Sequence, residues 1–546
     1  MQITFNGKET KVEDFQKPIE IWKKEIEESK RSIIACNVNH EVKNLLYELK
    51  DGDVVSLISR GERDGNAIYI RGVLYIMAMA FQRIYPEVKL TVKYQLSGAM
   101  FCKGENETIT EEMLEKVKAE MQKIIDQDLP IKKIEMTKEE AFDFYEKEKT
   151  LRGKLQLGNK VKDGVCLYFC EEYYNYFYGV MPISTGFITL FDLERYKDGF
   201  LVRYPSRKDP DRIQRYKETK KLHRTLEEYE DIHSILKINT VYRLNKKIEE
   251  GGARDTILLA EALHEKKIAE IANQIVKKKG VRVILIAGPS SSGKTTFAKR
   301  LGIQLRLNGL KPVTISVDNY FVERPETPRD ENGNYDFECI EAIDLELFNQ
   351  HLKMLLNGET IQVPTFDFYN GTKLYKGETM DLADDEVLVI EGIHCLNDKL
   401  TEQIPKEMKY KIYISALTVL NIDNFNRIST TDTRLIRRIV RDYQFRGYTA
   451  THTLRAWESV NKGEQKYIFP FQEEADSMFN TSLVYEISAL KDIAITLLKE
   501  VTREEPEYAE AKRLIAMLQY FESVDKKLIP KNSLLQEFLG DSIFDY

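Results

Sequence analysis

One stretch near the middle of the chain limits the possible folds more than any other, the run from Val281 to Thr296. It begins with an apolar, β-branched segment, as expected of a strand that is buried on both faces of a parallel sheet. The segment leads into a loop with the spacing G-x-x-x-x-G-K-T, and a helical pattern resumes at Phe297. A strand before this loop and a helix after it are the context in which the spacing forms a phosphate-binding P-loop. The sequence therefore predicts an α/β domain that binds a nucleoside triphosphate.

The residue types in this loop suit phosphate chemistry. Gly288 and Gly293 allow the backbone to curl so that its N–H groups point at phosphate oxygens, and the following helix adds its positive N-terminal end. Lys294 provides a cation for the β- and γ-phosphates, and the Thr295 hydroxyl is a candidate Mg²⁺ ligand. The predicted ATP-binding residues are Gly288, Pro289, Ser290, Ser291, Ser292, Gly293, Lys294, Thr295 and Thr296.

Composition indicates a soluble, intracellular protein with several domains. The length of 546 residues is enough for about three or four domains. The net charge of −7 gives no overall electrostatic footprint for nucleic acid. Six cysteines without a C-x-x-C pair favour reduced thiols over a disulfide framework. The longest apolar run, Val73 to Phe81, is too short to span a bilayer, and no signal peptide is visible. We expect a cytoplasmic protein without membrane attachment.

Residues 1 to about 60 have the pattern of a small α/β unit. Met1–Phe5 and Val12–Phe15 flank a turn at Asn6-Gly7, which is a hairpin signal. A short helix is expected at about Ile19–Glu28, then a strand at Ile33–Val38, and a turn and an apolar strand over residues 49–58. This segment resembles the ubiquitin-like TGS module at the front of threonyl-tRNA synthetases.

An α+β pattern follows from about residue 61 to 206. Two helices are expected, at about Gly72–Ile84 and Thr110–Gln127. The segments Arg71 to Tyr75 and Cys170 to Tyr174 resemble the H-x-x-x-H and C-x-x-x-H segments of the editing domain of threonyl- and alanyl-tRNA synthetases. Arg71, Tyr75 and Tyr174 stand where that family has histidines. The resemblance therefore implies the fold, but ester-hydrolysing editing is not expected without these imidazoles.

Two other features of this region have structural interpretations. Cys166 and Cys170 could form a thiolate pair, but no histidine or further cysteine accompanies them, which favours buried apolar thiols. The aromatic run from Tyr168 to Tyr178 could be a stacking platform for single-stranded nucleic acid. Because it does not alternate with Arg or Lys, buried strands with aromatic cross-strand pairs are preferred.

The region between the two halves is strongly charged. Asp209 to Ile235 is predicted to be one long polar helix, a solvated connector whose mixed charges do not form an RNA-binding stripe. A break at Gly251-Gly252 and a second helix at about Asp255–Lys279 lead to the P-loop strand. Near the end of the chain, two helices and a tail are expected to cover the α/β sheet or to join subunits of a homo-oligomer, without a chemical role. They are Glu486–Glu500, Glu507–Ser523 and Leu534–Leu539.

Two acidic residues stand at the ends of predicted strands beyond the P-loop. The strand Lys311–Val317 is followed by Asp318, the strand from Glu386 ends at Glu391, and Tyr410–Ser415 adds a fourth strand. Residues just past the carboxyl ends of parallel strands line the ligand crevice. Asp318 could there accept the proton of an attacking hydroxyl, whereas a turn or helix cap is the structural alternative. Glu391 is a candidate ligand for Mg²⁺ or its water shell.

A helix from Asp432 carries four arginines at i, i+3, i+4 and i+7, on one face. They are Arg434, Arg437, Arg438 and Arg441. Like charges at these spacings cost about 0.2–0.5 kcal/mol per pair in an isolated helix, and Asp442 is not expected to neutralise this face. Triphosphate is the predicted counter-charge, contacted by planar guanidinium groups. An exposed basic face is the alternative.

The order of motifs in the second half resembles the uridine kinase and phosphoribulokinase family. The matching segments, within roughly residues 253–499, are Gly288–Thr296, Asp318–Phe321, Asn334–Glu338, Pro364–Phe368, Glu391–Ile393 and the arginine helix. The resemblance implies that Asp318 is the catalytic base and that Asp336 binds a ribose hydroxyl. It also implies that the lid arginines are Arg434, Arg437 and Arg441. With its synthetase-like front half, the whole arrangement is similar to the bacterial fused nucleoside kinases.

One departure from the family concerns the acceptor. Uridine kinases typically have Tyr in the P-x-Y-D segment and a base-reading His after it, whereas this chain has Phe366 and no His follows in Tyr369-Asn370-Gly371. A pocket without hydrogen-bonding partners cannot strongly reject base analogues. Uridine is therefore an expectation from the resemblance and not from the residues.

These patterns predict a multidomain α/β and α+β protein. The expected units are residues 1–60 (TGS-like β-grasp), 61–206 (editing-like α+β), 207–275 (helical connector), 276–500 (P-loop kinase with a parallel sheet) and 501–546 (C-terminal helical extension). The expected activity is Mg²⁺-dependent transfer of the γ-phosphoryl group of ATP to a nucleoside 5′-hydroxyl. A kinase for another sugar-type alcohol and an ATP-switched RNA- or tRNA-binding protein are the alternatives. Nucleic acid is not favoured, because a pure switch has no use for an acceptor base such as Asp318.

Overall fold

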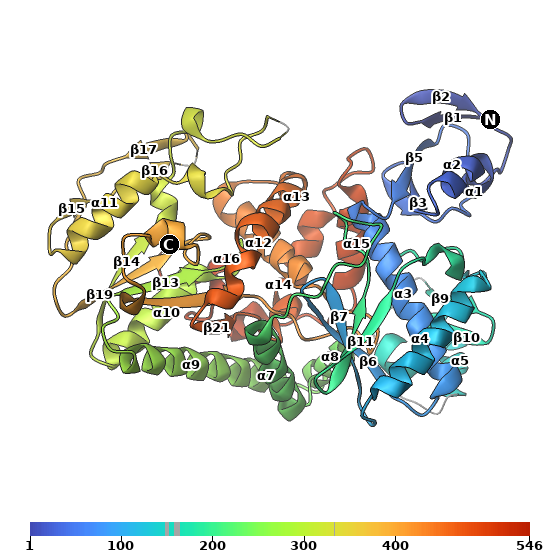
Figure 1. The fold of residues 1–546 in the computed structure, drawn as a ribbon, viewed down its shortest axis with the longest axis horizontal. Helices are drawn as coiled ribbons and strands as arrows, with labels where there is room; N and C mark the ends of the chain where they lie inside the picture. Colours follow the sequence, from blue (N-terminus) through green and yellow to red (C-terminus); the bar gives the residue numbers. More distant parts are fainter. Residues whose placement is uncertain (148–151, 158–163, 332, 368, 546) are drawn as a thin grey trace.

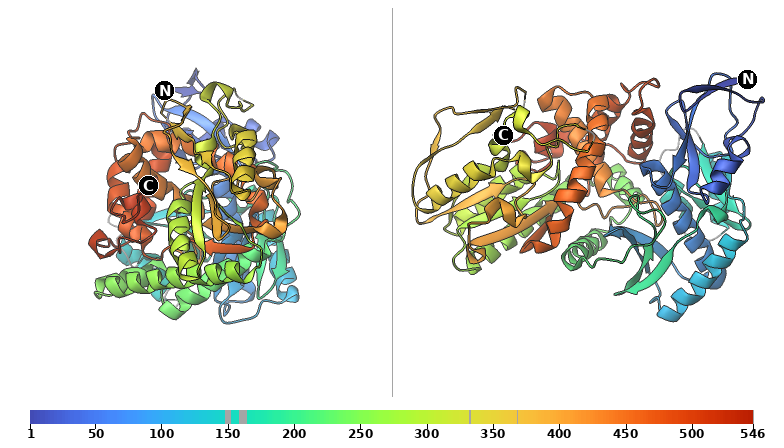
Figure 2. Two further views of the ribbon diagram at one scale, coloured as in Figure 1. Left: turned by 90° about the vertical axis from the view of Figure 1, so that its left-hand side faces the viewer. Right: turned by 45° about the horizontal axis from the view of Figure 1, so that its top comes forward.

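The chain forms two halves, one built from small sheets and one built around a single parallel sheet (Figure 1; Figure 2). The computed structural model describes residues 1–147, 152–157, 164–331, 333–367 and 369–545. The N-terminus lies at the far end of the first half, whereas the C-terminal end of the chain lies over the parallel sheet of the second half (Figure 1).

The first unit is a five-stranded sheet in the order β2-β1-β5-β3-β4. Its elements are β1 (Gln2–Phe5), β2 (Lys8–Lys11), α1 (Pro18–Ile21), α2 (Lys23–Glu28), β3 (Ile33–Val38), β4 (Glu41–Lys43) and β5 (Val54–Ser59). The predicted hairpin forms, but placing its second strand at Val12–Phe15 was wrong. Asn6 and Gly7 have φ of 47° and 79°, as a two-residue turn with both central residues at positive φ requires. Phe5 therefore pairs directly with Lys8.

The second unit is built on α3 (Arg63–Ile84), which starts nine residues before the predicted helix and is mostly buried from Ile68 to Phe81. By length and composition, α3 could cross a membrane, but 67% of its most apolar part is buried inside the protein. The helix α4 (Glu111–Asp126) packs on α3, with the side chain of Thr110 as its N-cap. A sheet in the order β11-β12-β7-β6 completes this layer. Its strands are β6 (Leu90–Leu96), β7 (Ala99–Gly104), β11 (Asp192–Tyr196) and β12 (Gly199–Arg203).

The aromatic run lies in a separate antiparallel sheet, as its preferred interpretation predicted. The elements are β8 (Lys132–Met136), α5 (Lys138–Glu146), α6 (Arg152–Leu157), β9 (Val165–Cys170) and β10 (Tyr173–Tyr176). Tyr174 lies opposite Phe169 across the strands, and the two rings stack with their centroids 5.5 Å apart. Cross-strand aromatic pairs of this kind stabilise a sheet.

The connector between the halves differs from the prediction. Its helices are α7 (Lys220–Leu236), α8 (Val241–Glu249) and α9 (Ala253–Lys277). The predicted helix from Asp209 was wrong over residues 209–219, where Pro210 disfavours helical φ and ψ at the residue before it. The prediction of a solvated connector does not hold for one face of α7, where Leu222, Leu226 and Tyr229 are buried.

The second half contains a five-stranded sheet in the order β14-β19-β13-β20-β21, with every neighbouring pair parallel. The strands are β13 (Val283–Ala287), β14 (Lys311–Ser316), β19 (Glu386–Glu391), β20 (Lys409–Ser415) and β21 (Ser477–Asn480). Ile284 and Ile286 face one core with α9 and α10 (Lys294–Leu307), whereas Val283 and Leu285 face another with α11 (Leu345–Leu356). Coverage of both faces explains why the strand sequence is continuously apolar.

Further helices follow β20 and complete the second half. They are α12 (Thr430–Arg446), α13 (Ala450–Tyr467), α14 (Glu486–Leu498), α15 (Tyr508–Leu518) and α16 (Gln536–Leu539). Two small hairpins pair β15 (Ile361–Gln362) with β18 (Thr379–Met380), and β16 (Thr365–Asp367) with β17 (Thr372–Leu374). Both α14 and α16 pack against α12, and α15 packs against α14. Helices α14 and α16 therefore cover the second half, which was one of the two predicted positions, whereas α15 also pairs with the first half through Glu510 and Arg63.

Candidate active site

The P-loop connects β13 to α10 and has the backbone that a phosphate cradle needs. Gly293, at the N-cap of α10, has φ of 87°, a conformation that favours glycine. A Cβ on Gly288 would lie 2.2 Å from the carbonyl oxygen of Ile414, so only glycine fits there. Lys294 folds back over the loop, and its Nζ donates to the carbonyl oxygens of Gly288 at 3.1 Å and Pro289 at 3.4 Å.

Two of the loop's backbone donors are bonded to carboxylates of the protein itself. The amide of Ser290 donates to Glu464 on α13 at 3.0 Å. The amide of Thr296 donates to Oε2 of Glu537 at 3.2 Å, and its hydroxyl donates to the same oxygen at 2.7 Å. Neither carboxylate was predicted from the sequence. Both come from distant helices, and no motif marks them.

Asp318 and Glu391 lie together at the carboxyl edge of the sheet, as the strand pattern predicted. Asp318 is exposed in the turn Val317–Tyr320 after β14, and Glu391 is the last residue of β19, in register with Ser316 of β14. The hydroxyl of Ser316 donates to Glu391 at 2.8 Å. Burial, and then the negative charge of Asp318, raise the pKa of Glu391 to about 7, while Lys294 acts in the opposite direction. The arrangement thus brings two carboxylates and the P-loop cation to one place.

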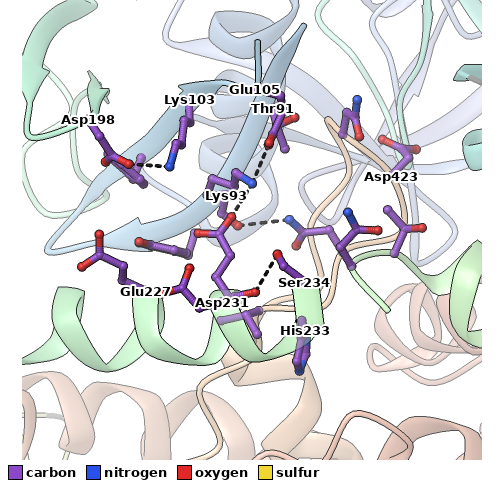
Figure 3. A pocket seen from close by; sticks show the side chains of 18 residues that line it. Thr91, Lys93, Lys103, Glu105, Asp198, Glu227, Asp231, His233, Ser234 and Asp423 are labelled. Atoms are coloured by element: carbon purple, nitrogen blue, oxygen red, sulfur yellow. Dashed lines mark hydrogen bonds and ion pairs between the residues drawn. The ribbon is translucent and has the colours of Figure 1, made fainter. Parts of the chain in front are cut away.

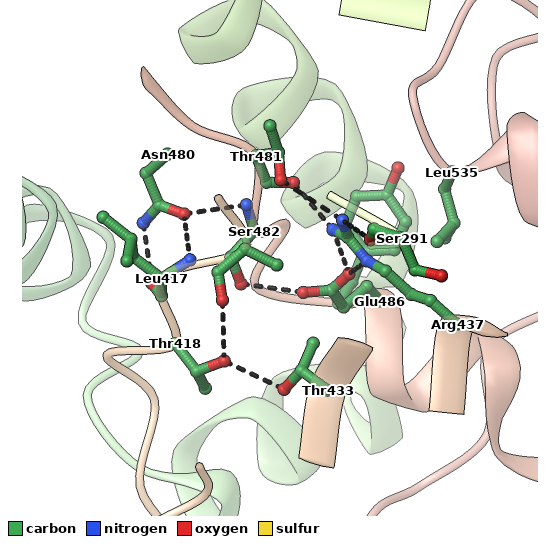
Figure 4. Close-up of polar contacts among 12 residues, drawn as sticks. Ser291, Leu417, Thr418, Thr433, Arg437, Asn480, Thr481, Ser482, Glu486 and Leu535 are labelled. Carbon is green, nitrogen blue, oxygen red and sulfur yellow. Dashed lines mark hydrogen bonds and ion pairs between the residues drawn. The ribbon is translucent and has the colours of Figure 1, made fainter. Parts of the chain in front are cut away.

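The arginine helix α12 contacts the P-loop, but its counter-charges differ from the prediction. Arg434 donates to the carbonyl oxygen of Ser290 at 3.1 Å and forms a bidentate pair with Glu464, in which one contact measures 2.7 Å. Arg437 donates to the carbonyl oxygen of Ser291 at 3.4 Å and pairs with Glu486 at 2.5 Å (Figure 4). Both pairs are almost fully buried.

The expectation that Asp442 cannot neutralise the arginine face was wrong. Its carboxylate lies 3.2 Å from Arg438, one helical turn earlier, and 2.7 Å from Arg441, and it also pairs with Arg446. Burial alone would raise the pKa of Asp442, but these three guanidinium groups hold it below its ordinary value. The Asp442 side chain reaches back along the helix to Arg438. It can therefore neutralise this face although it directly follows Arg441 in the sequence.

The residues predicted to hold the acceptor lie around the same edge. Asp336 accepts a hydrogen bond from the hydroxyl of Tyr467 at 2.9 Å. Phe366 on β16 lies beside the turn that carries Asp318, and its ring centroid is 5.5 Å from that of Phe321. Tyr467, at the end of α13, was not identified from the sequence, because nothing near it marks a binding role.

A partly buried carboxylate, Glu338, lies behind these acceptor residues. Glu338 lies against Gly463 of α13, where a Cβ on the glycine would be 2.4 Å from Cβ of Glu338. Burial, followed by the charge of Glu464, raises the pKa of Glu338 to about 7. Glu338 is the last residue of the Asn334–Glu338 motif. The sequence identified this motif but predicted no role for Glu338.

In the first half, the side chains at the editing-like positions are bonded internally. Tyr75 donates to the carbonyl oxygen of Tyr168 at 3.0 Å, Tyr174 donates to that of Phe144, and Nε of Arg71 donates to that of Val180. Cys170 is buried as predicted, and Cys166 is partly buried beside Glu135. Across the described ranges, no three His, Cys, Asp or Glu side chains are grouped as metal ligands.

A polar cavity of about 270 Å³ lies between the two halves (Figure 3). Strands β6 and β7, helix α7 and the loop 419–424 line it. Lys93 pairs with Glu105 at 2.6 Å and also with Glu230 of α7. Asn421, from the loop before α12, donates to the carbonyl oxygens of Val92 and Lys93, both at 3.1 Å. These contacts join the first half to the segment that leads to the arginine helix.

Comparison with known proteins identifies the second half. Residues 283–488 match the model of the phosphoribulokinase/uridine kinase family. The uridine kinase of Mycoplasma pneumoniae is 32% identical over 220 residues, which are 40% of this chain and 93% of that protein. The uridine kinase of Mycoplasma genitalium is 31% identical over 42% of this chain and 98% of its own length. A solved structure from Bacillus stearothermophilus, described as a possible uridine kinase, is 23% identical over 39% of this chain and 97% of its own, with a TM-score of 0.26.

The matched residues include the P-loop, Asp318, Glu391 and the arginine helix. The families of P-loop kinases use ATP and Mg²⁺ in general. Through its C-terminal half, this chain belongs to the phosphoribulokinase and uridine kinase family of P-loop kinases.

Proposed function

We propose that this protein is an ATP-dependent nucleoside kinase that transfers the γ-phosphoryl group to a 5′-hydroxyl. The main support for this proposal is that Lys294, Asp318 and Glu391 lie close together at one edge of the parallel sheet. Phosphoryl transfer needs positioned cations for the phosphates and a group that accepts the proton of the attacking hydroxyl. The identity with uridine kinases, which extends over almost their whole length, supports a nucleoside as the acceptor.

The roles follow from position and charge. The P-loop amides from Gly288 to Thr296 would hold the phosphates, and Lys294 would leave the loop carbonyls to contact the β- and γ-phosphates. Mg²⁺ fits the carboxylate and hydroxyl oxygens of Glu391 and Thr295, because it prefers hard oxygen ligands. When bound, the ion would neutralise part of the charge on the phosphates. Asp318, exposed beside this site, would position the acceptor hydroxyl and take its proton.

The arginines divide into two groups in this proposal. Arg434 and Arg437 are buried in ion pairs and donate to loop carbonyls, so they would act on the phosphates mainly by fixing the loop. Arg441 is partly exposed and, among the described residues, pairs with Asp442 of its own helix. Its guanidinium would be the one that turns to the transferring phosphoryl group and stabilises its charge.

The acceptor would lie between Asp336 and Phe366. The Asp336 carboxylate would accept a hydrogen bond from a ribose hydroxyl in place of the Tyr467 hydroxyl, and Phe366 would pack against the base. Phe366 offers no hydrogen bond, so we expect weak discrimination among bases. A kinase for another sugar-type alcohol remains the second candidate, favoured by this same lack of polar base contacts.

We also propose the unit boundaries and the nature of the first half. Residues 1–60 would be a TGS-like domain, 61–206 an editing-like domain without editing chemistry, 207–275 a connector, 276–500 the kinase, and 501–546 a helical extension. The sheet order β2-β1-β5-β3-β4, with β1 and β5 parallel, supports the first assignment. The contacts between Asn421 and β6 support a regulatory or structural role for the first half over an independent one.

The test is Mg-ATP turnover against uridine, cytidine, other nucleosides and pentose phosphates. We expect ADP release that depends on a nucleoside acceptor and falls by at least about 10²-fold in Asp318→Asn. Asp385→Asn is the matched control, because Asp385 is exposed and pairs with Lys311 at the opposite end of β14. Turnover that no acceptor stimulates, although ATP binds, would contradict the nucleoside-kinase proposal. Turnover only with pentose phosphates would favour the second candidate.

A further inference from the structure

The C-terminal segment Ser533–Gly540 covers the mouth of the P-loop. Leu534 is buried, and its side chain lies so close to Gly293 that a Cβ on the glycine would be 2.5 Å from it. Phe538 is also buried, and the Arg437 guanidinium lies over its ring at 5.1 Å from the centroid. The segment therefore packs against the loop on one side and against the arginine helix on the other.

Glu537, in the middle of this segment, occupies donors that a phosphate would need. Thr296 is the third residue of α10, and the first four N–H groups of a helix have no partner within the helix. These groups, at the positive end of the helix, form the anion site of a P-loop. The carboxylate of Glu537 accepts from both the amide and the hydroxyl of Thr296. One oxygen of an internal anion therefore stands where a phosphate oxygen would bind.

The segment is held in place from both ends but is not part of the sheet. Ser533 donates to Glu261 of α9 at 2.5 Å, and Tyr485 donates to the same carboxylate at 2.6 Å. At the other end, Gly540 has φ of 89° and ends α16, and the amide of Ile543 donates to the carbonyl oxygen of Lys531 at 3.1 Å. The short helix between these points could move away without breaking any strand pairing.

We propose that residues 533–540 are an internal plug of the nucleotide site, and that the nucleotide binds only after Glu537 has left the Thr296 donors. This inference rests on the proposed ATP-binding function of the loop. An amide and a hydroxyl cannot donate the same hydrogen to Glu537 and to a phosphate, so the two anions compete. The measured affinity for nucleotide then includes the free energy of releasing the segment.

Titration of Mg-ADP by calorimetry tests the competition. Glu537→Gln keeps the shape of the side chain but removes the charge, and we expect it to bind Mg-ADP about tenfold tighter than the unmodified protein, since hydrogen bonds to a charged acceptor are the strong ones. Asp541→Asn is the matched control, because it removes an exposed carboxylate four residues away and should leave the affinity unchanged. Equal affinities for Glu537→Gln and the unmodified protein would overturn the plug.

Hydrogen exchange of the unmodified protein supplies a second readout that needs no variant. The amides of residues 534–540 should be protected without ligand and should lose protection when Mg-ADP saturates the site. Protection that stays unchanged at saturation would overturn the plug while leaving the nucleotide site intact. Absence of Mg-ADP binding in the unmodified protein and in Glu537→Gln alike would overturn both the plug and the proposed kinase function, so the two failures are distinguishable.

Discussion

Replacing Glu486 with Gln should strongly destabilise the C-terminal half, because it leaves a buried guanidinium without its counter-charge. Arg437 is 0% exposed and Glu486 is 2% exposed, and the Nε–Oε2 distance is 2.7 Å (Figure 4). Removing one partner of such a pair costs about 3–5 kcal/mol. Neutral acceptors remain for Arg437, the carbonyl oxygen of Thr481 at 2.8 Å and that of Ser291 at 3.4 Å. We therefore expect a loss near the lower end of this range, about 3 kcal/mol.

Guanidinium unfolding with a tryptophan reporter measures this loss. The chain has two tryptophans, and in a Trp22→Phe background the remaining one, Trp457, lies beside the Arg434 guanidinium, 5.4 Å from its ring centroid. The fluorescence of Trp457 then reports the C-terminal half. Glu500→Gln, at an exposed position, is the control and should change the free energy of unfolding by less than about 0.5 kcal/mol.

A double variant separates the ion pair from other effects of the substitution. Arg437→Met with Glu486→Leu removes both charges, so its cost should be smaller than the sum of the single costs by at least about 2 kcal/mol. A cost of less than about 1 kcal/mol for Glu486→Gln, or strictly additive single costs, would refute the assignment of this pair as a buried, mutually compensated unit.

Three further predictions concern the same edge of the sheet. The pKa of Glu338 is raised from 4.5 to about 7, so between these values the folded protein keeps a proton that the unfolded chain releases, and stability falls as pH rises. Denaturant curves of Glu338→Gln at pH 5 and pH 8 should show a smaller fall in stability, reduced by up to about 3 kcal/mol. Identical pH dependences of the variant and the unmodified protein would contradict this prediction. The pKa of Glu391 is also raised to about 7, and since only the ionised carboxylate holds Mg²⁺, kcat/KM, which reports the free enzyme, should rise through pH 7 and be low at every pH in Glu391→Gln. A pH–rate profile with its optimum well below pH 7 would contradict this prediction. Gly293→Ala should lower the free energy of unfolding by more than Gly309→Ala does, because the new Cβ at Gly293 meets Leu534, whereas Gly309, at φ of 83° with open space around it, carries only the backbone strain, about 1 kcal/mol; equal losses in denaturant curves would exclude crowding as the cause.

The fold of the second half could be predicted because its signals are local. The apolar run at Val283–Ala287, the glycines of the loop and the helix after it each follow from neighbouring residues, and the strands at Lys311 and Glu386 repeat the same pattern. The strand β21 was missed, because Ser477–Asn480 is only four residues long and half polar. Its pairing with β20 depends on an edge position that only the tertiary fold provides.

The candidate site was predictable in part for the same reason. Lys294 and Asp318 come after strands and Glu391 is the last residue of one. The carboxyl ends of parallel strands lie at one edge of the sheet. The partners of the arginines were not predictable, because Glu464 and Glu486 come from other helices and their pairing depends on how these helices pack. A helical wheel places charges on a face but does not say what lies opposite that face.

The tail illustrates the same limit. Leu534–Leu539 was identified as a structural segment from its apolar pattern, and it is indeed buried. Nothing in that pattern shows that Glu537 would meet Thr296, more than 200 residues earlier in the chain. Long-range contacts of single polar side chains leave no periodic signal in a sequence.

The reaction proposed for this chain is the transfer of a phosphoryl group from ATP to an alcohol. Phosphorus NMR of a reaction containing Mg-ATP and uridine tests it most directly, because the spectrum identifies both products. We expect ADP and a nucleoside 5′-monophosphate to form in equal amounts, and both to form at least about 10²-fold more slowly with Asp318→Asn. Formation of ADP and inorganic phosphate at the same rate with and without a nucleoside or sugar acceptor would contradict it.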